Sequence, residues 1–268
     1  MLRKLLKYDF KASYLYLLVC YGIYIVLTIG FSLNLKSMIY SEYQAELYSS
    51  SEQVPEMIRT FATFSLMLLW IFGIIGLVVL MYVLIIHRFY SNLAGDQGYL
   101  SLTLPVSAKS HMLSKLISGL VFELLTMLVL CGGVFLMITI IGEGRFWTEF
   151  GYLVRRLFSE ITEFFGISFY LNTITGWIRG LLMIYFSICV GQLFQKHKIW
   201  GSIGTYLGLL IVLELFVTIG RLVIGVYGTV EAVFSAGGGW FDLVYNIIQI
   251  GVYFFLGSWI LEKRANLE

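Results

Sequence analysis

The chain has 268 residues, of which 59% are hydrophobic and only 13% are charged, and its formal net charge is +2. A soluble domain carries about a quarter charged residues, so this composition excludes an ordinary soluble protein. The small net charge gives no indication of nucleic-acid binding, and the mean hydropathy of +0.87 is typical of an integral membrane protein.

Six apolar runs are near or above the ~20 residues that a helix needs to cross a bilayer. In lipid, every backbone polar group must be hydrogen-bonded within the segment, so runs this long and continuous predict helices and not strands. The sequence therefore predicts an all-α integral membrane protein that forms a single transmembrane domain over residues 1–268. The six predicted spans are 14–33, 61–86, 113–141, 167–194, 200–219 and 243–261.

Residues 1–13 place leucine and phenylalanine side chains on one helical face and basic side chains largely elsewhere. This pattern predicts a short amphipathic helix in the membrane interface, with its basic side toward anionic lipid. A cytoplasmic extension of the first span is the alternative. The first run is too long for a signal peptide and lacks an A-x-A-like site, so we interpret it as a retained span. The predicted interfacial residues are Arg3, Lys4, Lys7 and Lys11.

The basic residues are unequally distributed between the two sides of the membrane. Six spans put both termini on one side, and that side holds eleven of the 18 lysines and arginines, whereas the other holds six. Cytoplasmic loops carry an excess of Lys and Arg. We therefore predict a multi-pass protein of the cell membrane with both termini in the cytoplasm.

Three outer segments differ in character. Residues 34–60 form a polar loop that is too small to have its own core. Residues 143–166 repeat aromatic and aliphatic side chains at three- and four-residue intervals between charges, which predicts an amphipathic helix on the outer leaflet. Residues 222–234 are apolar but too short to cross the membrane, and they predict a re-entrant piece between the fifth and sixth spans.

The segment between the second and third spans reads HRFYSNLAGDQGYLSLTLPVSAKSHM over residues 87–112. Gly95 and Gly98 permit tight turns, and Pro105 disfavours helix at the residue before it. Ser107 is positioned to cap a helix that starts near Ala108 and continues into the third span. The pattern predicts a cytoplasmic elbow, which is either a contact for a cytoplasmic partner or a plain connecting loop.

The amino-acid sequence of this segment resembles that of the corresponding segment in ABC-transporter permeases of the type-2 exporter superfamily. In many Firmicutes-type members the segment has the form FYxNLxxDEGYLxxTLPVS…SKL. Gln97 replaces the usual acid, which puts any salt bridge from that position to a partner in doubt. The matching residues are Phe89, Tyr90, Asn92, Leu93, Asp96, Gly98, Tyr99, Leu100, Thr103, Leu104, Pro105, Val106, Ser107, Ser114, Lys115 and Leu116.

The resemblance implies that this segment contains the coupling helix, which docks in a groove of a separate ATP-binding subunit. It further implies two copies of that subunit, a second permease that is identical or a sibling, and ATP and Mg²⁺ bound by the ATPase and not by this chain. Consistently, the sequence contains no Gly-Lys pair, which a Walker A phosphate loop requires. The implied ATPase-contact residues are Phe89, Tyr90, Asn92, Asp96, Gly98, Tyr99, Leu100 and Pro105.

Three charged residues lie deep in predicted spans, and such residues are functional candidates because their burial is costly. Arg179 and Glu214 lie at similar depths, about 20 Å from the inner ends at 1.5 Å per residue, so an ion pair between the fourth and fifth spans is plausible. Glu123 has no obvious basic partner. It could face a water-filled cavity, extend toward the cytoplasm or bind a cationic group.

Two glycine pairs, Gly176 with Gly180 and Gly204 with Gly208, have the spacing that allows close helix packing. We expect them to pack within the subunit, with a specific dimer contact as the alternative. The three histidines, at the cytoplasmic edges of spans, have no metal-ligand spacing. We assign no catalytic, cofactor-binding or metal-binding residues to the chain.

The leading functional hypothesis is the permease subunit of an ABC exporter, driven by an ATPase that docks on residues 88–107. Aromatic-rich spans favour an amphipathic or hydrophobic cargo such as a peptide, lipid or drug. A secondary transporter would usually show a polar midplane site and internal repeats, and no repeat is visible. A membrane scaffold without an ATPase is a further alternative. An intramembrane enzyme is disfavoured because no His is membrane-buried and no two acids share a helix face.

Overall fold

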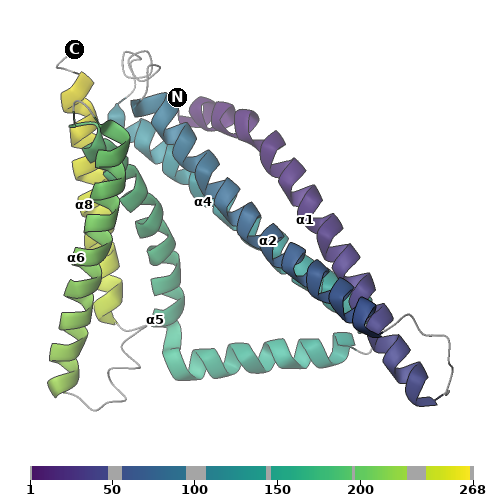
Figure 1. Cartoon of the computed structure of the whole chain (residues 1–268). Coiled ribbons are helices and arrows are strands. Elements are labelled where there is room, and N and C mark those ends of the chain that lie inside the picture. The colour runs from purple at the N-terminus through teal and green to yellow at the C-terminus, as the bar shows by residue number, and fades with distance from the viewer. Residues whose placement is uncertain are drawn as a thin grey trace. The chain divides into compact units, whose positions relative to one another are not determined.

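The computed structural model describes residues 2–47, 56–94, 107–142, 146–194, 197–227 and 240–265. These residues form long helices, and no strand occurs among them. Figure 1 shows the helices in chain order. Their bounds are α1 Leu2–Leu47, α2 Glu56–Phe89, the π-helical turn η1 Tyr90–Ala94, α4 Ala108–Ile141, α5 Phe146–Gly191, α6 Lys198–Tyr227 and α8 Trp240–Ala265.

Six stretches of these helices are long and apolar enough to cross a membrane, as the sequence predicts. The protein is therefore an all-α, multi-pass membrane protein. Each stretch contains most of a predicted span. Five of the six extend beyond the prediction at one end or both, because a helix continues wherever its backbone hydrogen bonds can continue, whereas the fourth ends three residues before the predicted 167–194. The stretches are Ser13–Tyr40, Met57–Leu93, Ala108–Ile141, Ile167–Gly191, Lys198–Gly220 and Asp242–Lys263.

The predicted interfacial segment is part of a longer helix. α1 is continuous from Leu2 to Leu47, so residues 2–13 are helical, which both sequence-based interpretations require. The side chains of Lys7 and Lys11 are exposed, whereas those of Arg3 and Lys4 lie outside the described ones. The location of this segment in the membrane interface stays a prediction.

The two other segments that the sequence predicts outside the spans are also continuous with neighbouring helices. Residues 146–166 are helical, as their spacing predicts, and continue directly into the fourth span within α5. Residues 222–227 continue α6 beyond the fifth span and do not start a separate piece. The remainder of the predicted re-entrant piece, 228–234, lies outside the described residues.

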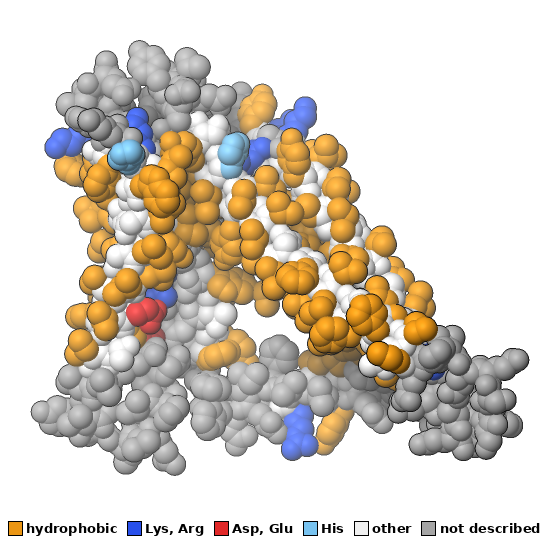
Figure 2. Space-filling view, viewed as in Figure 1, with side chains coloured by type: hydrophobic (Ala, Val, Ile, Leu, Met, Phe, Trp, Pro, Cys, Tyr) orange, Lys and Arg blue, Asp and Glu red, His pale blue; other side chains and the backbone are white. Residues whose placement is uncertain are grey.

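The chain divides into two compact units. One unit contains residues 1–10, 85–120 and 156–268, and the other contains residues 11–84 and 121–155. Figure 2 shows hydrophobic side chains over the lengths of the helices, with most of the charged ones near helix ends. This distribution is typical of a surface that faces lipid, in which an ionised side chain is costly.

In the unit of residues 11–84 and 121–155, α1 packs against α2 and α4 through a stripe of side chains spaced by three and four residues. Tyr24 is completely buried, and its hydroxyl donates to the carbonyl oxygen of Leu130 at 3.3 Å. One turn further along, Thr28 accepts a hydrogen bond from Nε1 of Trp70 at 3.1 Å. The Trp70 ring stacks on Phe31 with centroids 5.5 Å apart. Hydrogen bonds from one helix to another hold helices together where the hydrophobic effect is weak.

Glycine permits the closest approach in this unit. A Cβ atom at Gly133 would lie 2.5 Å from Cε1 and 2.7 Å from Cζ of Tyr24, so no side chain fits there without displacing the tyrosine ring. At the adjacent Gly132, a Cβ atom would meet nothing within 4 Å. Only the first of these two glycines is required by packing.

Glycine plays the same role in the other unit. A Cβ at Gly119 of α4 would lie 2.8 Å from the Tyr185 hydroxyl of α5, and one at Gly257 of α8 would lie 2.8 Å from Cε of Met112. These two close approaches bring α5 and α8 against the first turns of α4. In Figure 1, α6 runs alongside α8, where the Tyr245 and Phe216 rings stack with centroids 6.1 Å apart.

The two adjacent glycines of α4 provide a matched test of this packing. Gly133→Ala should destabilise the protein by roughly 1–3 kcal/mol, the usual cost of overpacking. Gly132→Ala should leave stability unchanged or slightly raised, because alanine favours helix. The measurement is the midpoint of heat-induced loss of monodisperse protein in mild detergent. Equal midpoints for the two variants would contradict the assigned contact with Tyr24.

Candidate functional site

The segment that carries the family resemblance is flanked by two described stretches. α2 ends at Phe89 and passes into the π-helical turn Tyr90–Ala94, and the chain is described again from Ser107. π turns are rare and frequently occur at functional sites. Residues 95–106, which include the predicted coupling helix, lie outside the described residues.

Ser107 caps α4, and this prediction is confirmed. α4 begins at Ala108, and the Ser107 side chain accepts a hydrogen bond from the backbone N–H of Ser110 at 3.4 Å. The Ser107 carbonyl accepts from the same N–H at 2.9 Å. A serine cap satisfies one of the N–H groups that have no partner within the first turn of a helix.

The predicted ATPase-contact residues fall into three groups. Phe89 is completely buried, and its ring stacks on Tyr185 of α5, with centroids 4.2 Å apart and planes 7° apart. Tyr90 and Asn92 are half-buried and still present part of their surface. Phe89 therefore packs inside the chain and holds the start of the segment in place. The remaining predicted contacts, Asp96, Gly98, Tyr99, Leu100 and Pro105, lie outside the described residues.

A buried ion pair involves a residue of α4 that follows this segment in the sequence. The Nζ atom of Lys115 on α4 contacts Oδ1 of Asp9 on α1, and the two residues are 7% and 6% exposed. The Ser114 hydroxyl donates to the other carboxylate oxygen at 3.4 Å. Removal of one partner of a buried ion pair leaves an uncompensated charge and lowers the stability of the protein by roughly 3–5 kcal/mol.

The same cluster reaches α2 and α5. Nη1 of Arg88, at the end of α2, donates to the backbone carbonyl of Asp9 at 2.8 Å. The Tyr185 hydroxyl donates to the backbone carbonyl of Lys115 at 3.1 Å. Arg88 and Lys115 are on opposite sides of the segment 95–106 in the sequence, and both hold Asp9. This polar cluster of Asp9, Arg88, Ser114, Lys115 and Tyr185 thus fixes the end of α2 and the start of α4, which flank the segment in the sequence, to the N-terminal part of α1 and to α5.

Sequence reasoning found part of this cluster. Ser114 and Lys115 belong to the motif that carries the family resemblance, but the sequence did not indicate their partner. Asp9 is the only acid among the first eleven residues, which otherwise carry four basic side chains. A single acid within a basic interfacial segment was therefore the available signal. The pairing itself depends on the distance between α1 and α4, which spacing along the chain does not give.

The proposed ion pair between Arg179 and Glu214 is not formed within 4.0 Å, although both residues are described. Nη1 of Arg179 instead donates to Oε1 of Gln249 on α8 at 3.5 Å, and the guanidinium lies over the Tyr245 ring, 6.0 Å from its centroid. Glu214 is exposed on α6. The Arg179 side chain points toward α8, where the Gln249 amide and the Tyr245 ring offer favourable contacts for a guanidinium group.

Arg179 belongs to a polar seam between α5 and α8. Four residues of α8, spaced by four, three and four, lie on one face and are at most 7% exposed. The Asn246 amide donates to Oδ1 of Asn172 and to Oγ1 of Thr175 on α5, each at 3.4 Å. Hydrogen bonds of this kind join helices within membranes. The four buried residues of α8 are Asp242, Asn246, Gln249 and Tyr253.

Glu123 lies within the span of α4 and in the unit of residues 11–84 and 121–155. Its side chain is half-buried, and its Oε2 atom is shielded and makes no hydrogen bond in the described structure. Tyr82 of α2 supplies a hydrogen bond to the carboxyl group. Glu123 therefore has one shielded oxygen without a hydrogen-bond partner, whereas Glu214 is exposed.

The two predicted glycine pairs differ from expectation. A Cβ atom built at Gly176, Gly180, Gly204 or Gly208 would meet nothing within 4 Å. The expected packing within the subunit is therefore not found in the described part of the chain. These positions face outward because the chain's own contacts on α5 and α6 use other sides of the helices.

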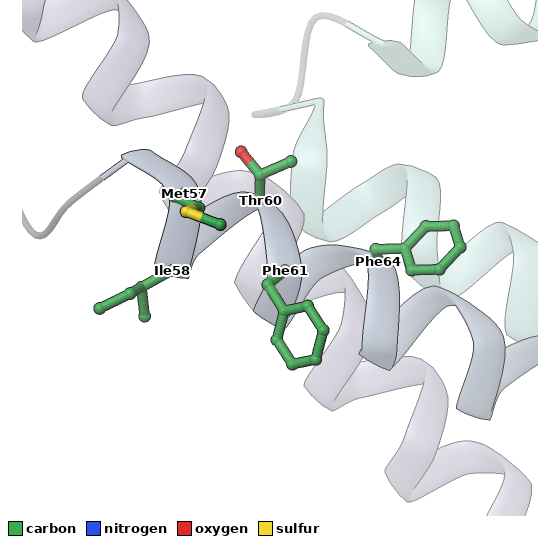
Figure 3. A pocket seen from close by; sticks show the side chains of 5 residues that line it. All are labelled: Met57, Ile58, Thr60, Phe61 and Phe64. Carbon is green, nitrogen blue, oxygen red and sulfur yellow. The ribbon is translucent and has the colours of Figure 1, made fainter.

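The pocket at the start of α2 is lined mainly by exposed apolar side chains. Figure 3 shows its lining residues, and they point in different directions along the helix surface. Met57 is 85% exposed and Phe61 is 72% exposed. An apolar surface of this kind at the end of a span is what contact with lipid requires. The lining residues are Met57, Ile58, Thr60, Phe61 and Phe64.

The buried ion pair can be tested with neutral substitutions. Asp9→Asn and Lys115→Met should each lower the thermal midpoint in detergent, since each leaves one buried charge alone. The double variant should lose less than the sum of the two single losses, because it contains no unpaired charge. Lys7→Met removes an exposed charge from the same helix and should have little effect. Strictly additive losses would mean that Asp9 and Lys115 are not paired.

Comparison of the chain with protein-family models, with curated proteins and with solved structures gives no match.

Proposed function

We propose that this chain is the permease subunit of an ABC exporter in the cell membrane, with both termini in the cytoplasm. The observation that carries the proposal is the amino-acid sequence of residues 89–116, which resembles the ATPase-docking segment of type-2 exporter permeases. Six apolar helices agree with it. The orientation follows from the excess of basic residues on the side of the termini.

The polar cluster supports this proposal mechanically. A segment that receives force from a partner must be anchored at both ends, or it would yield without moving the helices behind it. Arg88 and Lys115 anchor the two ends on Asp9, and Phe89 stacks on Tyr185. Force applied to residues 95–106 would therefore act on α1, α2, α4 and α5 together.

In the proposed cycle, two ATP-binding subunits hold the ATP and Mg²⁺ and close on nucleotide binding. Their closure pushes the segment 88–107 of each permease, and two permeases, identical or siblings, rock against each other to open a path. The permease itself carries out no catalysis. The basic residues of the first eleven contact anionic lipid at the inner surface. The cargo is an amphipathic or hydrophobic molecule such as a peptide, lipid or drug.

The test is co-purification of the full chain from its native membrane, followed by identification of the bound proteins. We expect a stoichiometric cytoplasmic protein with a P-loop. The double variant Tyr99→Glu, Leu100→Glu should lose that protein while remaining monodisperse, because charges would enter the docking groove. Lys263→Glu, an exposed change near the C-terminus, should retain it.

Two results would contradict the proposal. Undiminished recovery of the ATPase by the double variant would mean that docking occurs elsewhere. A monodisperse chain that never carries a P-loop protein would favour a secondary transporter or a membrane scaffold, and the likeness of residues 89–116 would then have another origin.

A further inference from the structure

Glu123 is a carboxyl group within a membrane span, and it forms no salt bridge with any residue that the structure describes. Its Oε2 atom is shielded from solvent and has no hydrogen-bond partner in the described structure. An ionised carboxylate is very costly in such a place unless a cation or several donors compensate it. The Tyr82 hydrogen bond supplies only one donor.

The depth of Glu123 follows from its position on α4. It lies eight residues beyond Lys115, which at 1.5 Å per residue is about 12 Å deeper along the helix. Tyr82 lies six residues before Arg88, or about 9 Å along α2. Lys115 and Arg88 belong to the polar cluster at one end of these helices, so Glu123 and Tyr82 lie at similar depths within the apolar region.

Within the described part of its own unit, Glu123 lies near polar and aromatic groups, and the basic side chains lie elsewhere. The Tyr21 hydroxyl of α1 is 2.8 Å from Oγ1 of Thr126, which is one turn further along α4 than Glu123. Tyr82 is 36% exposed, so part of the residue is accessible from outside the chain. The described basic side chains of this unit belong to residues near helix ends, namely Lys11, Lys36, Arg59 and Arg155.

A carboxylate beside an aromatic ring is the chemistry that recognises an organic cation. The carboxylate supplies the opposite charge, and the face of a tyrosine ring attracts an ammonium group by a cation–π interaction, which strengthens when water is absent. Glu123 and Tyr82 are both only partly covered by the chain. An amphiphile dissolved in the membrane could therefore reach these two residues laterally, from the lipid bilayer.

We propose that Glu123 and Tyr82 form an intramembrane binding site for the cationic group of an amphiphile, with Tyr21 and Thr126 completing its polar lining. If the chain is an exporter permease, the site indicates that the cargo is a cationic amphiphile, so this assignment of the cargo rests on the proposed function. The existence of the binding site does not depend on the proposed function.

The experiment measures binding to the purified chain in dodecyl maltoside, a detergent without charge or ammonium groups. The probe is a dansyl-labelled dodecyl chain ending in a trimethylammonium group. Its control is the same molecule with carbon in place of the charged nitrogen. The wild-type chain should bind the charged probe at least about ten-fold more tightly than the neutral one, the range of one charge-assisted contact.

Glu123→Gln should reduce binding of the charged probe to the level of the neutral one and leave the neutral probe unaffected. Glu214→Gln removes an acid from another span and should bind both probes as the wild type does. Equal affinity of the wild type for the two probes would overturn the proposal and indicate a carboxyl group that holds a proton. Unchanged binding by Glu123→Gln at a ten-fold preference would place the cation elsewhere and would also overturn it.

Two additions keep the test decisive. If Glu123→Gln is not monodisperse, the comparison of the two probes on the wild type decides the requirement for charge, and Glu123→Asp, which keeps the charge, should retain the preference. Displacement of the probe by phosphatidylethanolamine would uphold the cation site but overturn its assignment to cargo. The measurement contains no ATPase, so its outcome is independent of the co-purification test.

Discussion

The ion pair between Asp9 and Lys115 links parts of the chain that are separated by more than a hundred residues. Both side chains are shielded from solvent, so neither charge has a favourable alternative partner in water. Ser114 and the Arg88 contact to the Asp9 backbone surround the pair with additional donors. A buried pair of this kind contributes little net stability, but it defines one arrangement because every other arrangement leaves a charge unpaired. The contact between the N-terminal part of α1 and the start of α4 depends on it.

Polar groups within the spans are used in three different ways. Tyr24, Thr28 and Trp70 form hydrogen bonds that hold α1 to its neighbours. The seam of α5 and α8 surrounds a permanent charge, Arg179, with amide and aromatic groups. Glu123 is an acid with a shortage of partners, because its shielded Oε2 atom makes no hydrogen bond in the described structure. In a membrane, this shortage is a stronger indication of an external ligand than polarity by itself.

The sequence was sufficient to predict the class of fold, because the length of an apolar run and the backbone's need for hydrogen bonds leave few alternatives. It was also sufficient for the Ser107 cap, which is a local interaction between residues three apart. It could not predict contacts between helices. No partner was predicted for Asp9, and Arg179 was expected to pair with Glu214 on grounds of depth alone. Depth restricts the possible partners, but the rotation of each helix about its axis decides among them, and a single sequence contains little information about that rotation.

The unbroken α4 helix has a mechanical consequence. It begins one residue after the segment 95–106 and meets α5 at Gly119, where the absence of a side chain permits the closest approach. The part of α4 before Gly119 is about 17 Å long and the part after it about 33 Å, at 1.5 Å per residue. A rigid rod that pivots at such a point is a lever of unequal arms. A displacement of its short arm would reach the opposite end of such a rod about twice as large.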